Sequence, residues 1–200
     1  MKRKLLLITC IGILGVSAYG NNFTPERNSL NFKAGITGGT LKIDDESDQD
    51  TSSNISLNLE YIATSASGLE YGLGVGFSKI NPNEDIEFRY VLGDIDTFPV
   101  YGLLRYKFDT QSNWNPYVFA NLGYAYTNEK FGGSEDDDIP FIDIEGELYY
   151  ACGIGLEYKE NLSVEFLWSR SELDVDVKGE GSGDADADLF TLALGYRLDM

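Results

Sequence analysis

Residues 69–78 read Leu-Glu-Tyr-Gly-Leu-Gly-Val-Gly-Phe-Ser, and they give the clearest indication of the fold. Each odd-numbered residue from Leu69 to Phe77 is large and apolar, whereas each even-numbered residue is charged, small or polar. Alternation with a period of two is typical of a β-strand whose two faces meet different surroundings. A run of about ten residues is also the length that crosses a bilayer when a strand is tilted.

The alternation recurs along the chain after residue 29. Large apolar residues occupy one parity and small, polar or charged residues occupy the other, and no segment shows the spacing of an amphipathic helix. The pattern predicts eight strands, at residues 30–37, 55–61, 69–78, 98–108, 118–126, 147–158, 162–169 and 190–200.

The connections between these strands alternate in length. Short connections fall at residues 63–68, 109–116 and 159–161, and long ones, which hold most of the acidic side chains, fall at residues 41–54, 80–97, 127–146 and 172–188. Transmembrane barrels show this asymmetry, with short periplasmic turns and longer extracellular loops. We therefore predict an all-β fold, an eight-stranded antiparallel up-and-down transmembrane β-barrel with four acidic surface loops.

Alternation alone does not separate a membrane barrel from a soluble barrel of the lipocalin type, whose apolar face points inward. The polar face here is rich in small residues such as Gly72, Gly74 and Gly76, which suit the narrow interior of an eight-stranded barrel. Aromatic residues also gather at two levels, as they do at the two interfaces of a membrane. We expect one girdle at the short-turn ends of the strands, formed by Tyr61, Tyr71, Tyr106, Phe108, Tyr158 and Tyr196, and a second toward the opposite ends, formed by Phe77, Phe98, Tyr124, Tyr126, Tyr150, Trp168 and Phe190.

Charged residues on the polar parity of the strands are predicted to point into the lumen. The two signs are nearly balanced, and a buried charge must be paired, so salt bridges that fill the lumen are the favoured interpretation. A gated polar path for small solutes stays open as the alternative. The predicted cluster comprises Lys33, Glu60, Glu70, Arg105, Glu157, Glu165 and Arg197, with Lys107 as a further candidate.

The first residues have the pattern of a secretory signal, with Lys2, Arg3 and Lys4 before an apolar stretch. We expect residues 1–20 to be a cleavable signal peptide and residues 21–200 to form the barrel. Cys152 is then the one remaining cysteine, so no internal disulfide is possible. The formal net charge of −18 disfavours nucleic acid as a partner. The sequence has no histidine, which excludes a Ser-His-Asp triad and a Cys/His metal cluster.

At residues 98–108, 116–124 and 192–198 the chain resembles the small outer-membrane barrels of Gram-negative bacteria, namely the OmpA-type transmembrane domain and the porin-like and opacity-type proteins. The resemblance implies a bacterial outer-membrane location, contact with lipid and lipopolysaccharide, insertion by the barrel-assembly machinery, and a monomer. Enzymes among such barrels use a histidine base, so a non-enzyme is expected. Met200 stands where these barrels usually carry an aromatic residue.

The expected function is support of envelope integrity, or adhesion to a host or cell-surface ligand through the loops, with a small-solute channel as the alternative. Asp184, Asp186 and Asp188 have the spacing that opens an EF-hand loop, but Leu189 stands where glycine is required. We therefore expect no cofactor and no dedicated metal site. A looser hypothesis is that divalent cations bridge residues 136–138 to lipopolysaccharide phosphates.

Overall fold

The computed structural model describes residues 25–43, 49–65, 67–80, 95–131, 142–177 and 181–200. The predicted signal peptide and the acidic residues 136–138 lie outside these ranges. The strands are β1 (Arg27–Ile43), β2 (Gln49–Thr64), β3 (Leu69–Ile80), β4 (Ile95–Lys107), β5 (Trp114–Tyr126), β6 (Asn128–Phe131), β7 (Ile142–Tyr158), β8 (Leu162–Val177) and β9 (Gly181–Asp199).

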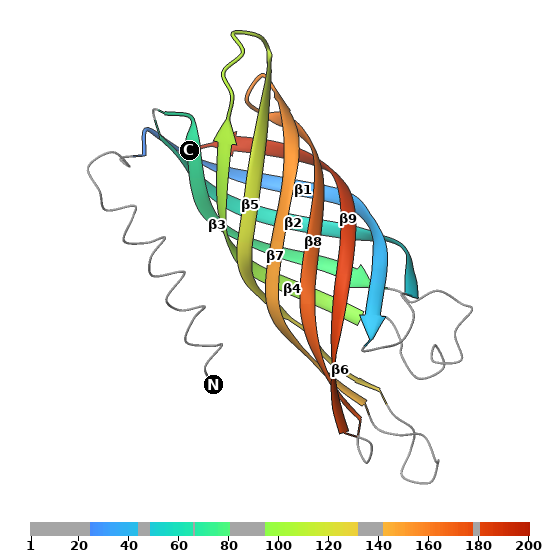
Figure 1. The fold of residues 1–200 in the computed structure, drawn as a ribbon. Coiled ribbons are helices and arrows are strands. Elements are labelled where there is room, and N and C mark those ends of the chain that lie inside the picture. The colour runs from blue at the N-terminus through green and yellow to red at the C-terminus, as the bar shows by residue number, and fades with distance from the viewer. Residues whose placement is uncertain (1–24, 44–48, 66, 81–94, 132–141, 178–180) are drawn as a thin grey trace.

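The strands form one closed antiparallel sheet, shown in Figure 1. Consecutive strands pair with each other except β5 and β6, β1 pairs with β9, and β5 pairs with β7 to complete the ring. The short β6 continues the β5 side of this pairing against the start of β7. The predicted eight-stranded up-and-down barrel is therefore confirmed. The described segments contain no helix of the length and hydropathy needed to cross a bilayer.

The two ends of the barrel differ. The short turns between β2 and β3, β4 and β5, and β7 and β8 lie at one end, together with the start of β1 and the end of β9. We call this the turn end (top of Figure 1). At the opposite end, which we call the hairpin end, β7, β8 and β9 extend farther than the other strands (Figure 1). Pairing of β8 with β9 continues as far as Val177 and Gly181.

Three of the predicted long loops are wrong in part, because strands occupy much of them. β1 runs to Ile43, β2 begins at Gln49, and β7 begins at Ile142, all inside segments expected to be loops. The mixed acidic composition of these segments resembles loop sequence. Two neighbouring strands can nevertheless continue their backbone hydrogen bonds into water, since the ladder itself requires no apolar face.

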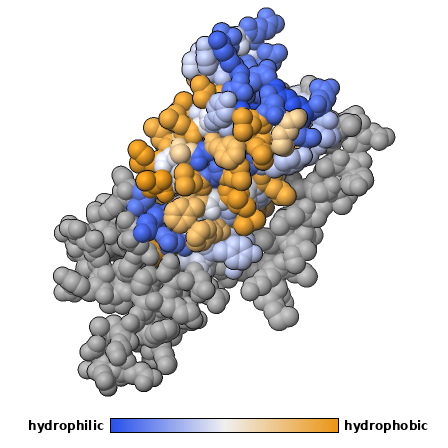
Figure 2. Space-filling view, turned by 180° about the vertical axis from the view of Figure 1, so that it is seen from behind, coloured by the Kyte–Doolittle hydropathy of each residue, from blue (hydrophilic) through white to orange (hydrophobic). Residues whose placement is uncertain are grey.

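The apolar face of the wall points outward. Leu194 exposes 66% of its surface, whereas Glu70 exposes 0%. Figure 2 shows the outward side chains as an apolar band across the wall, with hydrophilic residues gathered at the turn end. Along β4 exposed residues such as Val100 alternate with buried ones such as Tyr101. The inside-out arrangement predicted from the small residues of the polar face is what the structure has.

The lumen also holds large aromatic rings, which the expectation of small and charged residues did not include. Tyr117, Phe119 and Tyr149 are all buried inside the wall. The glycines beside these rings explain how they fit. A Cβ on Gly155 would lie 2.1 Å from Cζ of Tyr117, and a Cβ on Gly74 would lie 2.4 Å from Cε2 of Tyr101. The inward glycines therefore leave space for rings from neighbouring strands.

Candidate functional site in the barrel lumen

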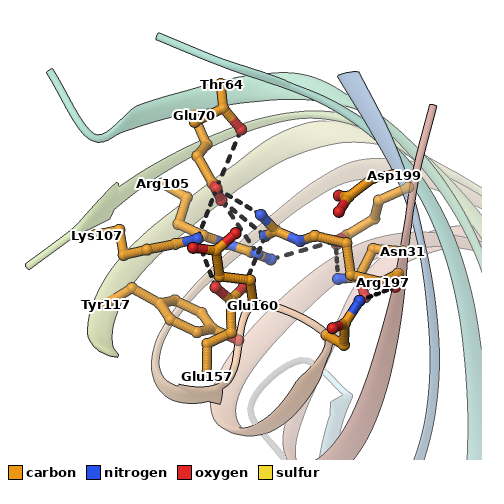
Figure 3. A network of polar contacts seen from close by, with 12 residues as sticks. Asn31, Thr64, Glu70, Arg105, Lys107, Tyr117, Glu157, Glu160, Arg197 and Asp199 are labelled. Carbon is orange, nitrogen blue, oxygen red and sulfur yellow. Dashed lines mark hydrogen bonds and ion pairs between the residues drawn. The ribbon is translucent and has the colours of Figure 1, made fainter. Parts of the chain in front are cut away.

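The seven charged residues predicted for the lumen converge in one network, together with Lys107. Figure 3 shows the part of it that holds Glu70, Arg105, Lys107, Glu157 and Arg197. Alternation along each strand points the members of the network inward, and the antiparallel register brings them to similar depths. All except Lys107 are buried. They are Lys33 on β1, Glu60 on β2, Glu70 on β3, Arg105 and Lys107 on β4, Glu157 on β7, Glu165 on β8 and Arg197 on β9.

Four of these charges form a layer at the turn end. Arg197 donates two hydrogen bonds to Glu70, of 2.6 Å and 2.9 Å, and its Nη2 lies 3.1 Å from Oε2 of Glu157. Nζ of Lys107 lies 3.1 Å from Oε1 of Glu70 and 2.5 Å from Oε1 of Glu157. Each cation therefore contacts both carboxylates.

A second layer lies deeper in the barrel. Nζ of Lys33 is 2.8 Å from Oε1 of Glu60 and 2.6 Å from Oε2 of Glu165. Arg105 joins this layer to the turn-end layer. Its guanidinium nitrogens lie 3.3 Å from Glu60, 3.2 Å from Glu165 and 3.4 Å from Glu70. Arg105 is thus the one described residue that is ion-paired to both layers.

Lumenal tyrosines complete the network. Tyr117 donates a 2.6 Å hydrogen bond to Glu165, and Tyr101 donates one of 3.1 Å to Glu60. The guanidinium carbon of Arg105 also lies 4.4 Å from the centre of the Tyr117 ring, a cation–π distance. Because Tyr117 is on β5, which supplies no charge, every strand of the ring contributes to the network.

The network is electrically balanced, with four cations and four carboxylates. Buried ions are tolerated when they are paired and hydrogen-bonded. Removal of one partner leaves a buried ion whose desolvation cost is no longer compensated. The Nε atoms of Arg105 and Arg197 are buried and have no hydrogen-bond partner among the described residues. The arrangement fills the lumen with fixed, mutually neutralised charges.

A cavity of about 30 Å³ lies next to the network, on the side of the hairpin end. Lys33, Glu60 and Tyr101 border it on one side, and hydroxyl-bearing residues of several strands line much of the rest. The cavity has room for about two water molecules. Oγ of Ser56 and Oδ1 of Asn121 border it and are buried with no hydrogen-bond partner in the described part of the chain.

The predicted aromatic residues form two sets on the outer wall. Close ring pairs occur at both ends of the wall: Tyr106 and Phe108 are 5.0 Å apart at the turn end, and Phe77 and Phe98 are 5.2 Å apart toward the hairpin end. Trp114 also belongs at the turn end, where its ring lies 4.6 Å from Tyr158. The sequence interpretation missed Trp114 because it placed residues 109–116 in a turn. All members of both predicted sets are exposed or half-exposed. The turn-end set is Tyr61, Tyr71, Tyr106, Phe108, Tyr158 and Tyr196, and the other set is Phe77, Phe98, Tyr124, Tyr126, Tyr150, Trp168 and Phe190.

Just beyond the second aromatic set the outer wall becomes charged. Arg170 pairs there with Asp186 at 3.4 Å and donates a 2.7 Å hydrogen bond from Nε to Asp188. Trp168 donates a 3.2 Å hydrogen bond to the same Asp188. Of the acidic triplet considered for calcium, Asp186 and Asp188 are thus engaged with Arg170. The described residues contain no group of three or more metal-ligating side chains.

At the turn end Arg27 ties three strand ends together. It is ion-paired to Asp199 at the end of β9, with an Nε to Oδ1 distance of 2.7 Å, and to Glu160 in the turn before β8. Partial burial alone would lower the pKa of Arg27, but its hydrogen bonds to Asp199 and Glu160 raise that pKa above its ordinary value. The guanidinium therefore stays charged at any physiological pH.

The family model described as the outer membrane protein beta-barrel domain matches residues 6–197. This chain belongs to the outer membrane β-barrel protein family. It is accordingly a protein of the bacterial outer membrane, and the apolar band of its wall faces lipid. In such barrels short turns face the periplasm and longer connections face the exterior. We therefore take the turn end as periplasmic and the hairpin end as extracellular.

Several solved structures of outer-membrane proteins are similar to this chain. Ail, the attachment invasion locus protein of Yersinia pestis, is 16% identical, with a TM-score of 0.52 and coverage of 86% of this chain and 99% of Ail. OprG of Pseudomonas aeruginosa is 14% identical, with a TM-score of 0.47 over 87% and 97% of the chains. The outer membrane enzyme PagL is 14% identical, with a TM-score of 0.44 over 84% and 98%. At this identity, Ail shows a shared fold alone. No curated protein matches the sequence significantly.

Proposed function

We propose that this outer-membrane barrel is a non-enzymatic protein that acts through its extracellular side, either by contacting a host or cell-surface ligand or by supporting the integrity of the envelope. The observation that carries the proposal is the charge network. A barrel whose lumen is filled by paired, buried ions offers no free path to solutes, so its work is expected at its outer end.

The geometry of the network argues against conduction. Glu70, for example, contacts Arg105, Lys107 and Arg197, and its side chain is fully buried. A passing ion has to separate such pairs in a medium of low dielectric constant, where each separation is costly. An eight-stranded barrel also has an interior only wide enough to be filled by its own side chains.

The strands that continue past the outer aromatic level supply the proposed working surface. β9 extends nine residues beyond Phe190 toward its start at Gly181, which corresponds to about 30 Å of strand. The paired extensions of β8 and β9 form a stiff support, since their ladder is continuous. The strongly acidic composition favours cationic partners over polyanions.

The proposal of a non-enzyme is supported by the composition of the chain. None of its 200 residues is histidine, so no imidazole is present to act as a general base. Each buried carboxylate is paired with a cation. A free carboxylate pair poised for acid–base chemistry is absent from the described lumen.

Planar-bilayer recording tests whether the lumen is closed. The wild-type barrel is expected to give no stepwise conductance, whereas Arg105→Ser removes the link between the two layers and is expected to give flickering openings. Ser112→Ala, in a periplasmic turn, is the matched control. Regular wild-type channels whose conductance changes with Arg105→Ser would contradict the proposal and support a channel.

A small-solute channel is the second candidate, and the cavity beside Tyr101 favours it. That cavity continues the polar lumen toward the extracellular end, and the unpartnered atoms of Ser56 and Asn121 offer hydrogen bonds to a passing solute. Swelling of vesicles that contain the barrel, in solutions of small neutral polyols, measures this activity directly.

Replacing connections with short Gly-Ser linkers tests the extracellular role. Removal of residues 81–94 or 132–141 is expected to leave a folded barrel that has lost cell binding or envelope protection. Cell attachment and survival in detergent are measured against cells with the intact barrel and cells without it. Full activity of both linker variants would contradict a role for these connections.

A further inference from the structure

The inward side chains become shorter on the extracellular side of the ion network. On β8 the inward Glu165 is followed by the inward Ser169, and on β2 the inward Glu60 is preceded by the inward Ser56. A serine reaches less far into the lumen than a glutamate does, so side chains from facing strands no longer meet there. The gap that results is the cavity of about 30 Å³ beside Tyr101.

Two buried polar atoms that border this cavity have no hydrogen-bond partner in the described part of the chain. They are Oγ of Ser56 and Oδ1 of Asn121, whose residues are 5% and 6% exposed. A buried polar group without a partner destabilises the folded state, and native structures contain few of them. A ligand in the cavity that forms hydrogen bonds to both atoms removes this cost.

Charge and size select the ligand. Lys33 borders the cavity with its ammonium between Glu60 and Glu165, and Glu60 is shared with Arg105. An added ion of either sign therefore meets a like charge that is already paired, in a medium of low dielectric constant. A sugar or polyol is too large, because the cavity has room for about two water molecules. The neutral ligand of this size that both donates and accepts hydrogen bonds is water.

The lining supplies the further partners that a buried water needs. The hydroxyl of Tyr101 lies 3.3 Å from Oδ1 of Asn58 and 3.1 Å from Oε1 of Glu60, and both Tyr101 and Asn58 line the cavity. Thr37 and Thr191 also line it, and their hydroxyls are hydrogen-bonded to each other at 2.9 Å. Hydroxyl and amide oxygens carry two lone pairs, so they can accept a further hydrogen bond. A water in the cavity thus finds the roughly two to four polar neighbours that it requires.

We propose that this cavity is a binding site for about two ordered water molecules, which form hydrogen bonds to Oγ of Ser56 and Oδ1 of Asn121. Ser56 is on β2 and Asn121 is on β5, and β3 and β4 lie between these strands in the ring. The waters therefore bridge separate parts of the wall across the lumen, as ion pairs do in the two charged layers. The site is a structural one, and it requires neither a ligand of the extracellular side nor a path for solutes.

Nuclear Overhauser transfer from water, measured by NMR on the deuterated full barrel in lipid nanodiscs, detects such waters. The wild-type barrel is expected to show a cross-peak between water and the side-chain amide protons of Asn121. Ser56→Val fills part of the cavity with methyl groups and is expected to weaken this cross-peak. Ser67→Val, in an exposed periplasmic turn, is the matched control and should leave it unchanged.

The urea midpoint of unfolding gives a second readout. Ser56→Ala is expected to lower it, because the hydrogen bond from Ser56 to water is lost. Ser29→Ala is the matched control: Ser29 is also a buried serine whose hydroxyl has no partner among the described residues, but it does not border the cavity. Removal of that unpaired hydroxyl is expected to leave the midpoint unchanged or higher.

A folded wild-type barrel without the water cross-peak would overturn the proposal, and this result does not depend on whether any variant folds. A higher midpoint for Ser56→Ala would also overturn it, since that is the behaviour of a dry cavity. So would replacement of the water cross-peak by one from added glycerol, which would indicate a path for solutes. Conductance across planar bilayers, which tests the proposed function, is a separate readout.

Discussion

Among single residues, Arg105 has three ionic partners in the lumen, more than any other cation of the network. It contacts Glu60, Glu70 and Glu165 and stacks against Tyr117, so its removal leaves three carboxylates with one fewer cation. Lys107, by contrast, is partly exposed at the periplasmic mouth, where water compensates for a lost partner.

We expect Arg105→Met to lower the free energy of unfolding by about 3 to 5 kcal/mol, because it leaves uncompensated buried charge. Urea unfolding in lipid vesicles, followed by tryptophan fluorescence, measures the change. The double variant Arg105→Met with Glu165→Gln restores the balance of charge and is expected to recover part of the loss. A single variant as stable as wild type would show that the network contributes little to stability.

Gly155 provides a second test at this scale, because the ring of Tyr117 occupies the place of its missing side chain. Gly155→Ala places a methyl group 2.1 Å from Cζ of Tyr117 and must displace the ring from Glu165. We expect a loss of about 1 to 3 kcal/mol in the free energy of unfolding. Gly102→Ala, whose Cβ would have no neighbour nearer than 3.8 Å, is the control and should be tolerated.

At the scale of elements, the turns show where the sequence is not optimal for its structure. In the turn between β4 and β5, Gln111 has a φ of 55°, a left-handed conformation that favours glycine. We expect Gln111→Gly to raise the free energy of unfolding by about 0.5 to 1 kcal/mol. The Cβ strain that glycine relieves in the folded turn outweighs the conformational entropy that it adds to the unfolded chain. Asn113→Gly, in the same turn without a positive φ, should be neutral or destabilising. Equal effects of the two substitutions would contradict this explanation.

The strands themselves follow from the period of two, but their lengths do not. The alternation of Leu69, Tyr71 and Leu73 identifies β3 because the outer face must be apolar where it meets lipid. Beyond the aromatic levels that requirement ends, and residues such as Asp186 and Asp188 take outward positions. The sequence interpretation therefore ended strands at the membrane boundary, whereas backbone pairing continues into water.

At the scale of the whole molecule, the inside-out arrangement makes a prediction about Cys152. Its side chain is exposed on the outer wall, at the centre of β7, where the family places lipid. In vesicles that contain a barrel beginning at residue 21, a charged maleimide is expected to label Cys152 only after unfolding. The control is Cys152→Ser combined with Asn113→Cys, in an exposed turn, which should be labelled without unfolding. Rapid labelling of Cys152 in the folded barrel would contradict a lipid-facing wall.

The positions of the strands in the membrane, the face that each presents and the set of inward charges follow from the sequence alone, because the direction of a side chain along a strand is set locally by its parity. Which charges meet depends on the closed barrel. Arg197 and Glu70 are 127 residues apart in the chain, and their contact depends on the register accumulated around the closed ring. The same is true of the Tyr117 ring over Gly155, since the ring and the glycine come from different strands whose relative heights no local pattern specifies.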